Sequence, residues 1–514
     1  MAYTLNCKTQ EQAGGSFMTL EFTAEVLCEQ LTLGIKLPVG GGQQPMRVVR
    51  RRFRPYKPNE AVMVLRVPKT ILPSDHKAFF VTELVNKHLD LSEILCTYNT
   101  GKRRGAPPYD PVMMTTLLVY SYLTECESSR KMEEATFDVL PCRMITGDQH
   151  PDHDTINDFR NRHLAALSKL YEQSVKLAQD NSLISLKYVA NDGSKFKANA
   201  SKHKAMSYDR MCQTIEKYEK EIPEIKSKIE MAGKGDVPVY QGQLQELYKD
   251  LTIREERLPK LKAAKAALEK RMKRDASNQK KRTTKKQEQA AQRKTKQPKA
   301  GKTKKSKKLK KVRTPEEKAQ INFTDDQSRI MPWKKTFEQC YNAQIAVDSQ
   351  AQIIVGNYVN QSTNDKKELL PMVSQIARRF GRLPDNMSAD TGFFSEENLT
   401  HKVWDKLGIT SLHIPPAKEE KGKKPPAKVG RMPKDSSEAD KMVRKLRTRA
   451  GSAIYRARKA IVEPVFGQIK RALDFDEFKL RGLKRVNQEF SFVCAIHNFK
   501  KLYTHGFQFA AGTG

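Results

Sequence analysis

Apolar residues recur at two different spacings along the chain, and the spacing changes near residue 184. From residue 76 to residue 182 they recur every three or four positions, which is the spacing of one helix face. Helices are predicted over 77–89, 109–125, 128–140 and 154–180. Ser128 and Asp154 stand where the N-caps of two of these helices are expected. This part of the chain is therefore predicted to be an all-helical domain.

Beyond residue 184, short runs rich in strand-forming residues alternate with helical patterns. Strands are predicted at 186–192, 339–349, 351–360, 386–390 and 409–415, and a tight polar turn joins the second and third as a hairpin. Helices are predicted at 366–380, at 395–407 and from about residue 437 onward, with a Pro/Lys-rich loop at 415–436. This order favours an α/β fold in which helices flank a mixed sheet.

A long insertion separates the first predicted strand from the second. Residues 206–270 show helical spacing among alternating charges, with a Gly/Pro break near "AGKGDVP", so an antiparallel helical hairpin is predicted. Residues 270–313 hold 21 Lys or Arg and only two acids. Disorder is predicted there, because this segment lacks the apolar surface that would offset its ordering entropy. A non-specific grip on DNA phosphates is favoured over a merely solubilising tail.

Charge and composition limit the classes of binding partner that we expect. The 514 residues carry a formal charge of +35, and nucleic acid is the first candidate partner because Lys and Arg that neutralise phosphates release counterions. An anionic membrane surface is disfavoured, since no run approaches the roughly 18 to 20 apolar residues that cross a bilayer and no signal pattern is present. The eight scattered cysteines indicate reduced packing residues. We expect a cytoplasmic protein, associated with the nucleoid if the source is prokaryotic.

Two aspartates stand at predicted strand ends. Asp192 closes "LKYVAND" and Asp390 closes "NMSAD", and a glycine follows each within two residues. Ligands of open α/β sheets bind beyond the carboxyl ends of strands, so both are candidate site residues. For either one alone, a turn or cap aspartate is the alternative. Gly193, Lys195 and Lys197 are interpreted as room and charge for a phosphate backbone.

A third acid lies in the final helical region, in a row of basic residues. Five residues share one face of this predicted helix: Arg456, Lys459, Glu463, Gly467 and Lys470. Ordinary ion pairing of Glu463 with Lys459 and Lys470 is one interpretation, and a DNA-binding row with Tyr455 stacking or hydrogen-bonding beside it is the other. Pro464 removes a backbone donor, so a kink or a helix start is predicted there.

Three carboxylates without a histidine base fit hard divalent cations. Mg²⁺ prefers carboxylate, water and phosphate oxygens, and two such ions suit phosphodiester transfer. A second candidate metal cluster, "HPDHD" at 150–154, is disfavoured because Asp154 is better explained as a helix cap. Arg160, Arg162 and His163 would line a helix in a DNA groove, although a packing or dimerisation domain is equally open.

Seven blocks of the sequence carry a resemblance to a known family. In chain order they are "RGAPPYDPVMM", "SSRKMEEAT", "PDHDTINDFRNRH", "NDGSKFKANASKHKAMSYDRM", "SRIMPWKKTFEQCYNAQIAVDS", "SADTGFFSEENL" and "YRARKAIVEPVFGQIK". Over about residues 52 to 505 they resemble the long branch of DDE-type insertion-sequence transposases with an InsH-like N-terminal domain. The resemblance implies an RNase H-like catalytic domain interrupted by an insertion. It assigns a metal-binding catalytic triad to Asp192, Asp390 and Glu463, with two Mg²⁺ ions as cofactor and Mn²⁺ as a substitute.

The resemblance also sets the expected domain boundaries. A flexible leader is expected over 1–51, with Met18 and Met46 as alternative starts to Met1. The other expected parts follow in order: a DNA-binding InsH-like helical domain at 52–183, the first part of the catalytic domain at 184–204, the insertion at 205–320 and the second part at 321–508.

Such families often carry a Tyr, Arg, Glu, Lys signature on the last helix. Tyr455, Arg458, Glu463 and Lys470 match it, except that four residues rather than three separate Arg458 from Glu463. Helical phase favours Lys459 over Arg458 as the base beside the glutamate.

The function that the resemblance implies is DNA transposition. Such an enzyme recognises the terminal inverted repeats of its own element in double-stranded DNA, has water cut the strand, and uses the freed 3′-hydroxyl to attack target DNA. Two alternatives stay open: an RNase H-like nuclease that never joins strands, and a catalytically silent transposase-derived DNA-binding protein. Because two ends must meet, a homodimer or larger assembly is expected on DNA, with the hairpin at 206–270 as a contact surface.

Overall fold

The computed structural model describes residues 71–98, 107–233, 241–294, 319–395, 398–399, 411–416, 430 and 436–507. The expected leader over 1–51, most of the helix predicted at 395–407, most of the loop at 415–436 and the basic segment from 295 to 313 lie outside these ranges.

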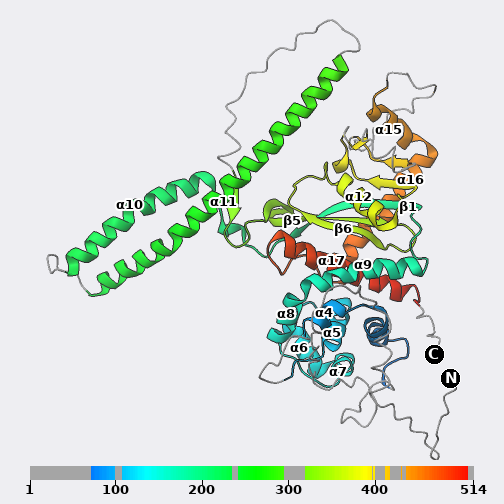
Figure 1. Ribbon diagram of the computed structural model, residues 1–514, viewed down its shortest axis with the longest axis horizontal. Helices are drawn as coiled ribbons and strands as arrows, with labels where there is room; N and C mark the ends of the chain where they lie inside the picture. Colours follow the sequence, from blue (N-terminus) through cyan, green and yellow to red (C-terminus); the bar gives the residue numbers. More distant parts are fainter. Residues whose placement is uncertain are drawn as a thin grey trace, which may run out of the picture. The chain divides into compact units, whose positions relative to one another are not determined.

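The region from Lys77 to Asp180 is helical, as the apolar spacing predicts. Its elements are α3 (Lys77–Glu83), the π-turn η1 (Leu84–His88), α4 (Ser92–Cys96), α5 (Pro111–Leu123), α6 (Ser129–Asp138), α7 (Leu140–Thr146), α8 (His153–Arg162) and α9 (Leu164–Asp180). Buried residues occur on every side of α5, and other helices surround it (Figure 1). Ser128 is the N-cap residue of α6, as predicted. The N-cap predicted at Asp154 was wrong: Asp152 caps α8, and its carboxylate accepts a hydrogen bond from the Thr155 N–H at 2.7 Å.

A six-stranded mixed sheet follows the helical region, so the predicted α/β class is confirmed. Its central strand is β1 (Tyr188–Lys197), which pairs antiparallel with β5 (Thr336–Asp348) and parallel with β7 (Asn386–Ala389). Beyond β7 lies β8 (Ser411–His413), parallel to it. On the other side of β5, β4 (Arg329–Trp333) and β6 (Ile354–Asn360) pair antiparallel with different halves of the strand. The spatial order is therefore β6 or β4, β5, β1, β7, β8.

Helices cover both faces of the sheet. Along β1, alternate residues point to opposite faces. Tyr188 and Phe196 point toward α16 (Arg449–Gly467), because the Tyr188 hydroxyl donates to the Ile454 carbonyl at 2.7 Å and the Phe196 ring contacts Phe466. The helix α12 (Leu369–Phe380) packs on β5 and β6. Asp192 shares the face of Tyr188, and Gly193 and Lys195 share the opposite face.

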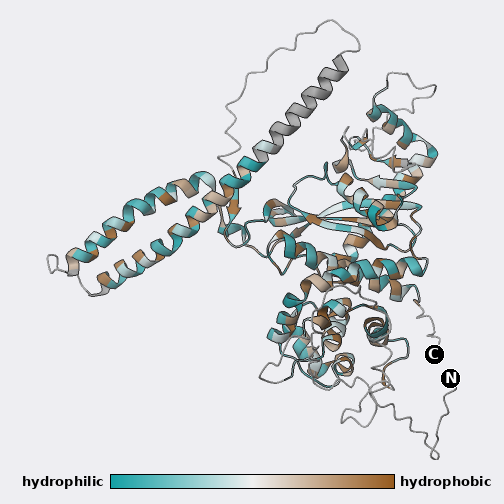
Figure 2. Ribbon diagram, viewed as in Figure 1, coloured by the Kyte–Doolittle hydropathy of each residue, from teal (hydrophilic) through white to brown (hydrophobic). Residues whose placement is uncertain are grey.

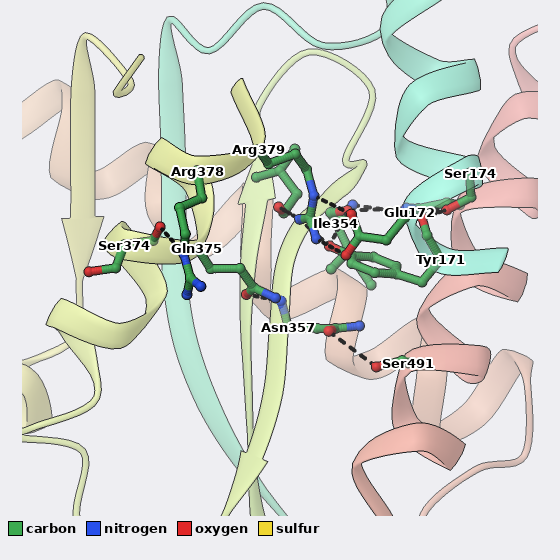
Figure 3. A network of polar contacts seen from close by, with 12 residues as sticks. Tyr171, Glu172, Ser174, Ile354, Asn357, Ser374, Gln375, Arg378, Arg379 and Ser491 are labelled. Carbon is green, nitrogen blue, oxygen red and sulfur yellow. Dashed lines mark hydrogen bonds and ion pairs between the residues drawn. The ribbon is translucent and has the colours of Figure 1, made fainter. Parts of the chain in front are cut away.

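The edge strand β6 has its free backbone groups satisfied by side chains rather than by another strand. These side chains come from three helices: Tyr171 of α9, Gln375 and Arg379 of α12, and Asn487 and Asn498 of α17 (Leu483–Thr504). The Gln375 side chain accepts from the Asn357 N–H at 3.0 Å, and the Tyr171 hydroxyl donates to the Ile354 carbonyl at 3.1 Å (Figure 3). Unpaired strand edges invite pairing with other chains, so these contacts protect the sheet.

The insertion contains two long helices, α10 (Tyr208–Gly233) and α11 (Gln241–Lys294). They run antiparallel, because Glu219 pairs with Lys262 while Lys226 pairs with Glu255, each at 2.7 Å. Their surfaces are largely hydrophilic, apart from a small apolar cluster (Figure 2). The short strands β2 (Ala205–Ser207) and β3 (Gln320–Asn322) pair where the insertion begins and ends.

The prediction of disorder from residue 270 was wrong as far as Lys294, where α11 ends. Residues 270–294 contain neither glycine nor proline, and Lys, Arg, Gln and Ala are good helix formers. They extend an existing helix, so no new nucleus is required. Lack of an apolar face therefore did not prevent helix formation here.

Pro464 lies inside α16, and the helix continues through it to Gly467 before the π-turn η4 (Gln468–Ala472). Proline has no N–H, so the carbonyl four residues earlier, at Ala460, loses its helical partner. The Gln352 side chain supplies the missing donor, with its Nε2 atom 3.0 Å from the Ala460 oxygen. The predicted irregularity near Pro464 therefore takes the form of a π-turn after the proline rather than a helix start.

We expect Gln352→Ala to lower the free energy of unfolding by about 1 kcal/mol, because the Ala460 carbonyl loses its protein donor. The loss should be smaller in a Pro464→Ala background, where residue 464 regains an N–H. Denaturant unfolding of the four proteins in this cycle measures the coupling, and equal losses in both backgrounds would contradict the pairing.

A buried polar network joins the N-terminal helices to α17. The Glu489 carboxylate accepts from the backbone N–H groups of Lys479 and Leu480 at 3.0 and 3.1 Å. The Lys479 amine lies 2.7 Å from Glu127, which precedes α6. Burial raises the pKa of Glu489 to about 7, despite the two backbone hydrogen bonds and the charge of Arg160, which act in the opposite direction.

The raised pKa of Glu489 makes the free energy of unfolding depend on pH, and its direction sets the sign of that dependence. The folded pKa of about 7 exceeds the ordinary value of 4.5, so folding takes up a proton between these pH values. The free energy of unfolding should therefore fall as pH rises from about 4.5 to about 7. Glu489→Gln removes this titration, and thermal melts across the window should show a shallower slope. An unchanged slope would show that Glu489 does not titrate there.

Candidate active site

The first two acids of the predicted triad lie where β7 stops. The parallel pairing of β1 with β7 ends at Asn191 and Ala389, and Asp192 and Asp390 are the next residues. The prediction that Asp192 ends its own strand was wrong. β1 continues to Lys197, and Asp192 pairs with Ile345 of β5. The Asp-Gly pair indicated a turn, but Gly193 stays extended. The strand that ends beside Asp192 is its neighbour β7.

The helix α16 brings the third acid to the same place, together with an arginine. The Arg458 guanidinium lies within ion-pair distance of all three carboxylates. Its Nη1 atom is 3.4 Å from Asp192 Oδ2, and its Nη2 atom is 3.7 Å from Asp390 Oδ1 and 3.3 Å from Glu463 Oε1. Residues 192, 390 and 463 are thus assembled around one cation.

The arginine and the three acids differ in how far their side chains are buried. The side chain of Arg458 is 6% exposed and that of Asp192 is 21% exposed, whereas Asp390 and Glu463 are 42% and 50% exposed. Burial raises the pKa of Asp192 to about 6, although Arg458 and the Gly193 N–H act to lower it. Asp192 therefore forms the floor of the site, and the other two acids face solvent.

The donor set fits a hard divalent cation chemically. All three acids offer carboxylate oxygens, which Mg²⁺ prefers, and together they already surround one positive charge. In the arrangement seen, the carboxylates are spread around the guanidinium, and the described residues include no group of three or more His, Cys, Asp or Glu spaced to hold a metal ion. A cation at the centre of the triad would take the place of Arg458.

The two histidines of the "HPDHD" cluster each contact another side chain of the protein. His153 Nδ1 lies 2.7 Å from Glu133 Oε2, and the His150 ring stacks on Phe137 with centroids 3.9 Å apart. These contacts account for both histidines without a metal ion.

The preference for Lys459 over Arg458 as the base beside Glu463 was wrong. Lys459 is exposed and forms no ion pair with a described residue, whereas Arg458 is buried on the sheet side of α16. Phase relative to Glu463 is a poor guide here, because β7 ends below the helix and leaves space for a guanidinium among the carboxylates. The Tyr455 ring lies 5.8 Å from the same guanidinium and is half-buried.

Three lysines predicted to contact DNA have partners inside the protein. The Lys470 amine, on η4, donates to Ser194 Oγ at 2.7 Å and to the Lys195 carbonyl at 3.0 Å. Lys195 lies 3.6 Å from Asp365, and Lys197 lies 2.9 Å from Glu477. Their charges are therefore used first to hold β1 in place. On α16, Arg456 and Lys459 are exposed.

The two arginines of α8 differ. Arg160 is buried, and its guanidinium donates to the Tyr122 hydroxyl at 3.0 Å and to the Glu127 carbonyl at 3.1 Å. It is a packing residue here, so the prediction that it lines a DNA-facing surface is not supported by its position. Arg162, two residues later on the helix, is exposed. His163 is buried against Tyr98.

Sequence reasoning missed Asp365, which lies in the loop between β6 and α12. The Asn342 Nδ2 and Gln344 Nε2 atoms each donate to Asp365 Oδ1 at 2.6 Å. An acid just before a helix indicates a cap or turn, and no other sequence signal pointed to it. The Asn and Gln of "YNAQ" on β5 were an available clue, because buried amides in a strand require polar partners.

Two family models match parts of the chain. Residues 67–162 match the family described as a transposase domain (DUF772), and residues 419–503 match the transposase DDE domain. Arg458 and Glu463 lie within the second match, and Asp192 and Asp390 lie outside both. The matches define a transposase with a DDE domain. Together the two matches support an insertion-sequence DDE transposase. No curated protein and no solved structure matched it.

None of the helices in the described ranges combines the length and apolar character needed to span a membrane.

We expect Arg458→Met to destabilise the metal-free protein by about 1–3 kcal/mol, because Asp192 then remains buried without a counter-charge. Adding Asp192→Asn should recover part of the loss, since the unpaired charge is gone. Thermal melts in EDTA test this, with Arg456→Met on the same helix as the exposed control. Equal losses with and without Asp192→Asn would rule out the charge explanation.

Proposed function

We propose that this transposase cleaves and joins DNA strands at the ends of its own insertion sequence, with Asp192, Asp390 and Glu463 as its DDE triad. The observation that carries the proposal is the convergence of these three acids, from β1, the end of β7 and α16, on one guanidinium. The strand order β6, β5, β1, β7, β8, with only β1, β7 and β8 parallel, supports an RNase H-like catalytic domain.

The triad would hold Mg²⁺, with Mn²⁺ as a substitute. Two ions bound there would supply an activated attacking oxygen and a stabilised leaving oxygen. Asp192, fixed in the sheet, sets the depth of the site. Asp390 and Glu463 face solvent, so a phosphodiester can approach them from outside. Arg458 offsets one of the three negative charges before the substrate arrives.

Double-stranded DNA is the proposed partner, both at the terminal inverted repeats and at the target. Arg456 and Lys459 are exposed on the helix that carries Glu463, which suits contacts to the phosphate backbone. Arg162 offers a similar contact from the N-terminal helices. Because transposition joins two ends to one target, we propose that the chain acts as a homodimer or larger assembly on DNA.

We expect Asp192→Asn to lower strand cleavage of end-containing DNA in Mg²⁺ on the order of a thousandfold or more, as for other catalytic residues. DNA binding, measured by gel shift, should persist. Asp385→Asn is the matched control, because Asp385 is exposed just before the opposite end of β7.

A strand-transfer assay with pre-cut ends separates the remaining functions. Joining to target DNA supports transposition, and cleavage without joining indicates a nuclease. Binding with no cleavage in Mg²⁺ or Mn²⁺ indicates a silent DNA-binding protein. Full cleavage by the Asp192→Asn protein would remove Asp192 from the triad.

A further inference from the structure

Asp365 is held against the two glycines that follow the triad aspartates. A Cβ atom on Gly193, directly after Asp192, would lie 2.9 Å from Asp365 Oδ1. A Cβ atom on Gly392, two residues after Asp390, would lie 3.5 Å from Asp365 Oδ2. The space left by Gly193 is therefore filled first by the Gln344 side-chain amide and then by the Asp365 carboxylate bound to it, not kept for a phosphate backbone as the sequence suggested.

Ordinary structural roles do not account for this acid. Asp365 does not cap α12, because the N-cap residue is Glu368. No backbone N–H of a described residue donates to the Asp365 carboxylate, as it would in an Asx turn. One oxygen, Oδ1, is bound by two side-chain amides and approached by Lys195. The other oxygen, Oδ2, receives no hydrogen bond from a described residue and faces the Gly392 segment.

The surroundings of Asp365 contain buried oxygen atoms without donors. Asn342 and Gln344 are fully buried, and among the described residues neither Asn342 Oδ1 nor Gln344 Oε1 accepts a hydrogen bond. Asn191, fully buried beside Asp192 and on the same sheet face as Gly193, has no partner for either side-chain atom among these residues. Buried polar atoms are normally satisfied by protein, water or ions, so the Gly193 face of β1, next to Asp192 in sequence, has unused capacity for a cation and its water.

We propose that Asp365 is a fourth carboxylate of the active site and binds a divalent cation beside Asp192 and Asp390, at the edge of β1 that β7 leaves open. This inference rests on the proposed function of the triad. Without the cation, Lys195 lies 3.6 Å from Asp365, as Arg458 lies beside the triad.

Direct Mn²⁺ binding to the full-length protein without DNA tests the proposal, since the unbound ion can be counted by electron paramagnetic resonance. Asp365→Asn keeps the side-chain shape and the amide contacts to Oδ1 but removes the charge. We expect it to weaken Mn²⁺ binding on the order of tenfold. Asp192→Asn should weaken binding at least as much.

Glu368→Gln is the matched control, because Glu368 is an acid of the same loop whose carboxylate accepts from the Tyr358 hydroxyl at 3.0 Å. It should bind Mn²⁺ like the wild type. If Glu368→Gln weakens binding as much as Asp365→Asn, loop packing explains the effect and the proposal is overturned.

The remaining outcomes separate this inference from the proposed function. Wild-type Mn²⁺ affinity in Asp365→Asn together with weakened binding in Asp192→Asn would overturn the fourth carboxylate and leave the triad intact. Wild-type affinity in both variants would count against metal binding by the triad itself.

Discussion

The contact between one guanidinium and three carboxylates is the constraint around which the catalytic part of this transposase is organised. Arg458 and Glu463 come from one helix, whereas Asp192 and Asp390 come from adjacent parallel strands of different length. The early end of β7 creates the space in which the four side chains meet.

Side-chain amides hold the elements that carry this site. Pro464, directly after Glu463, leaves the Ala460 carbonyl without a helical donor, and the Gln352 side chain donates to it instead. Asn487, Asn498 and Gln375 complete the edge of β6, and Asn342 and Gln344 hold Asp365. Asn342, Gln344 and Asn498 are buried. A buried amide costs stability unless it is bonded, so these residues fix a geometry that an apolar side chain would leave free. The three acids of the proposed triad are therefore positioned by a polar framework inside an otherwise apolar fold.

Periodicity predicted the elements better than it predicted their contacts. The helical region from 77 to 180 and the strands β1, β5, β6, β7 and β8 could be predicted, because burial leaves a local pattern in sequence, whereas the short strands β2, β3 and β4 were not predicted. The choice between Lys459 and Arg458 could not be predicted, since it depends on which face of α16 meets the sheet. Asp365 was missed because its partners lie on a strand some twenty residues earlier. The helix through 270–294 was missed because composition alone does not record that a helix has already begun.

That extended helix changes how the positive charge of the insertion is presented. In a disordered chain the lysines of this segment would have no fixed spacing. In α11, residues 270–294 rise about 38 Å at 1.5 Å per residue, which is about one turn of double-helical DNA. The segment is therefore a positively charged helix of defined length rather than a flexible charged chain, and its length is set by the number of residues it contains.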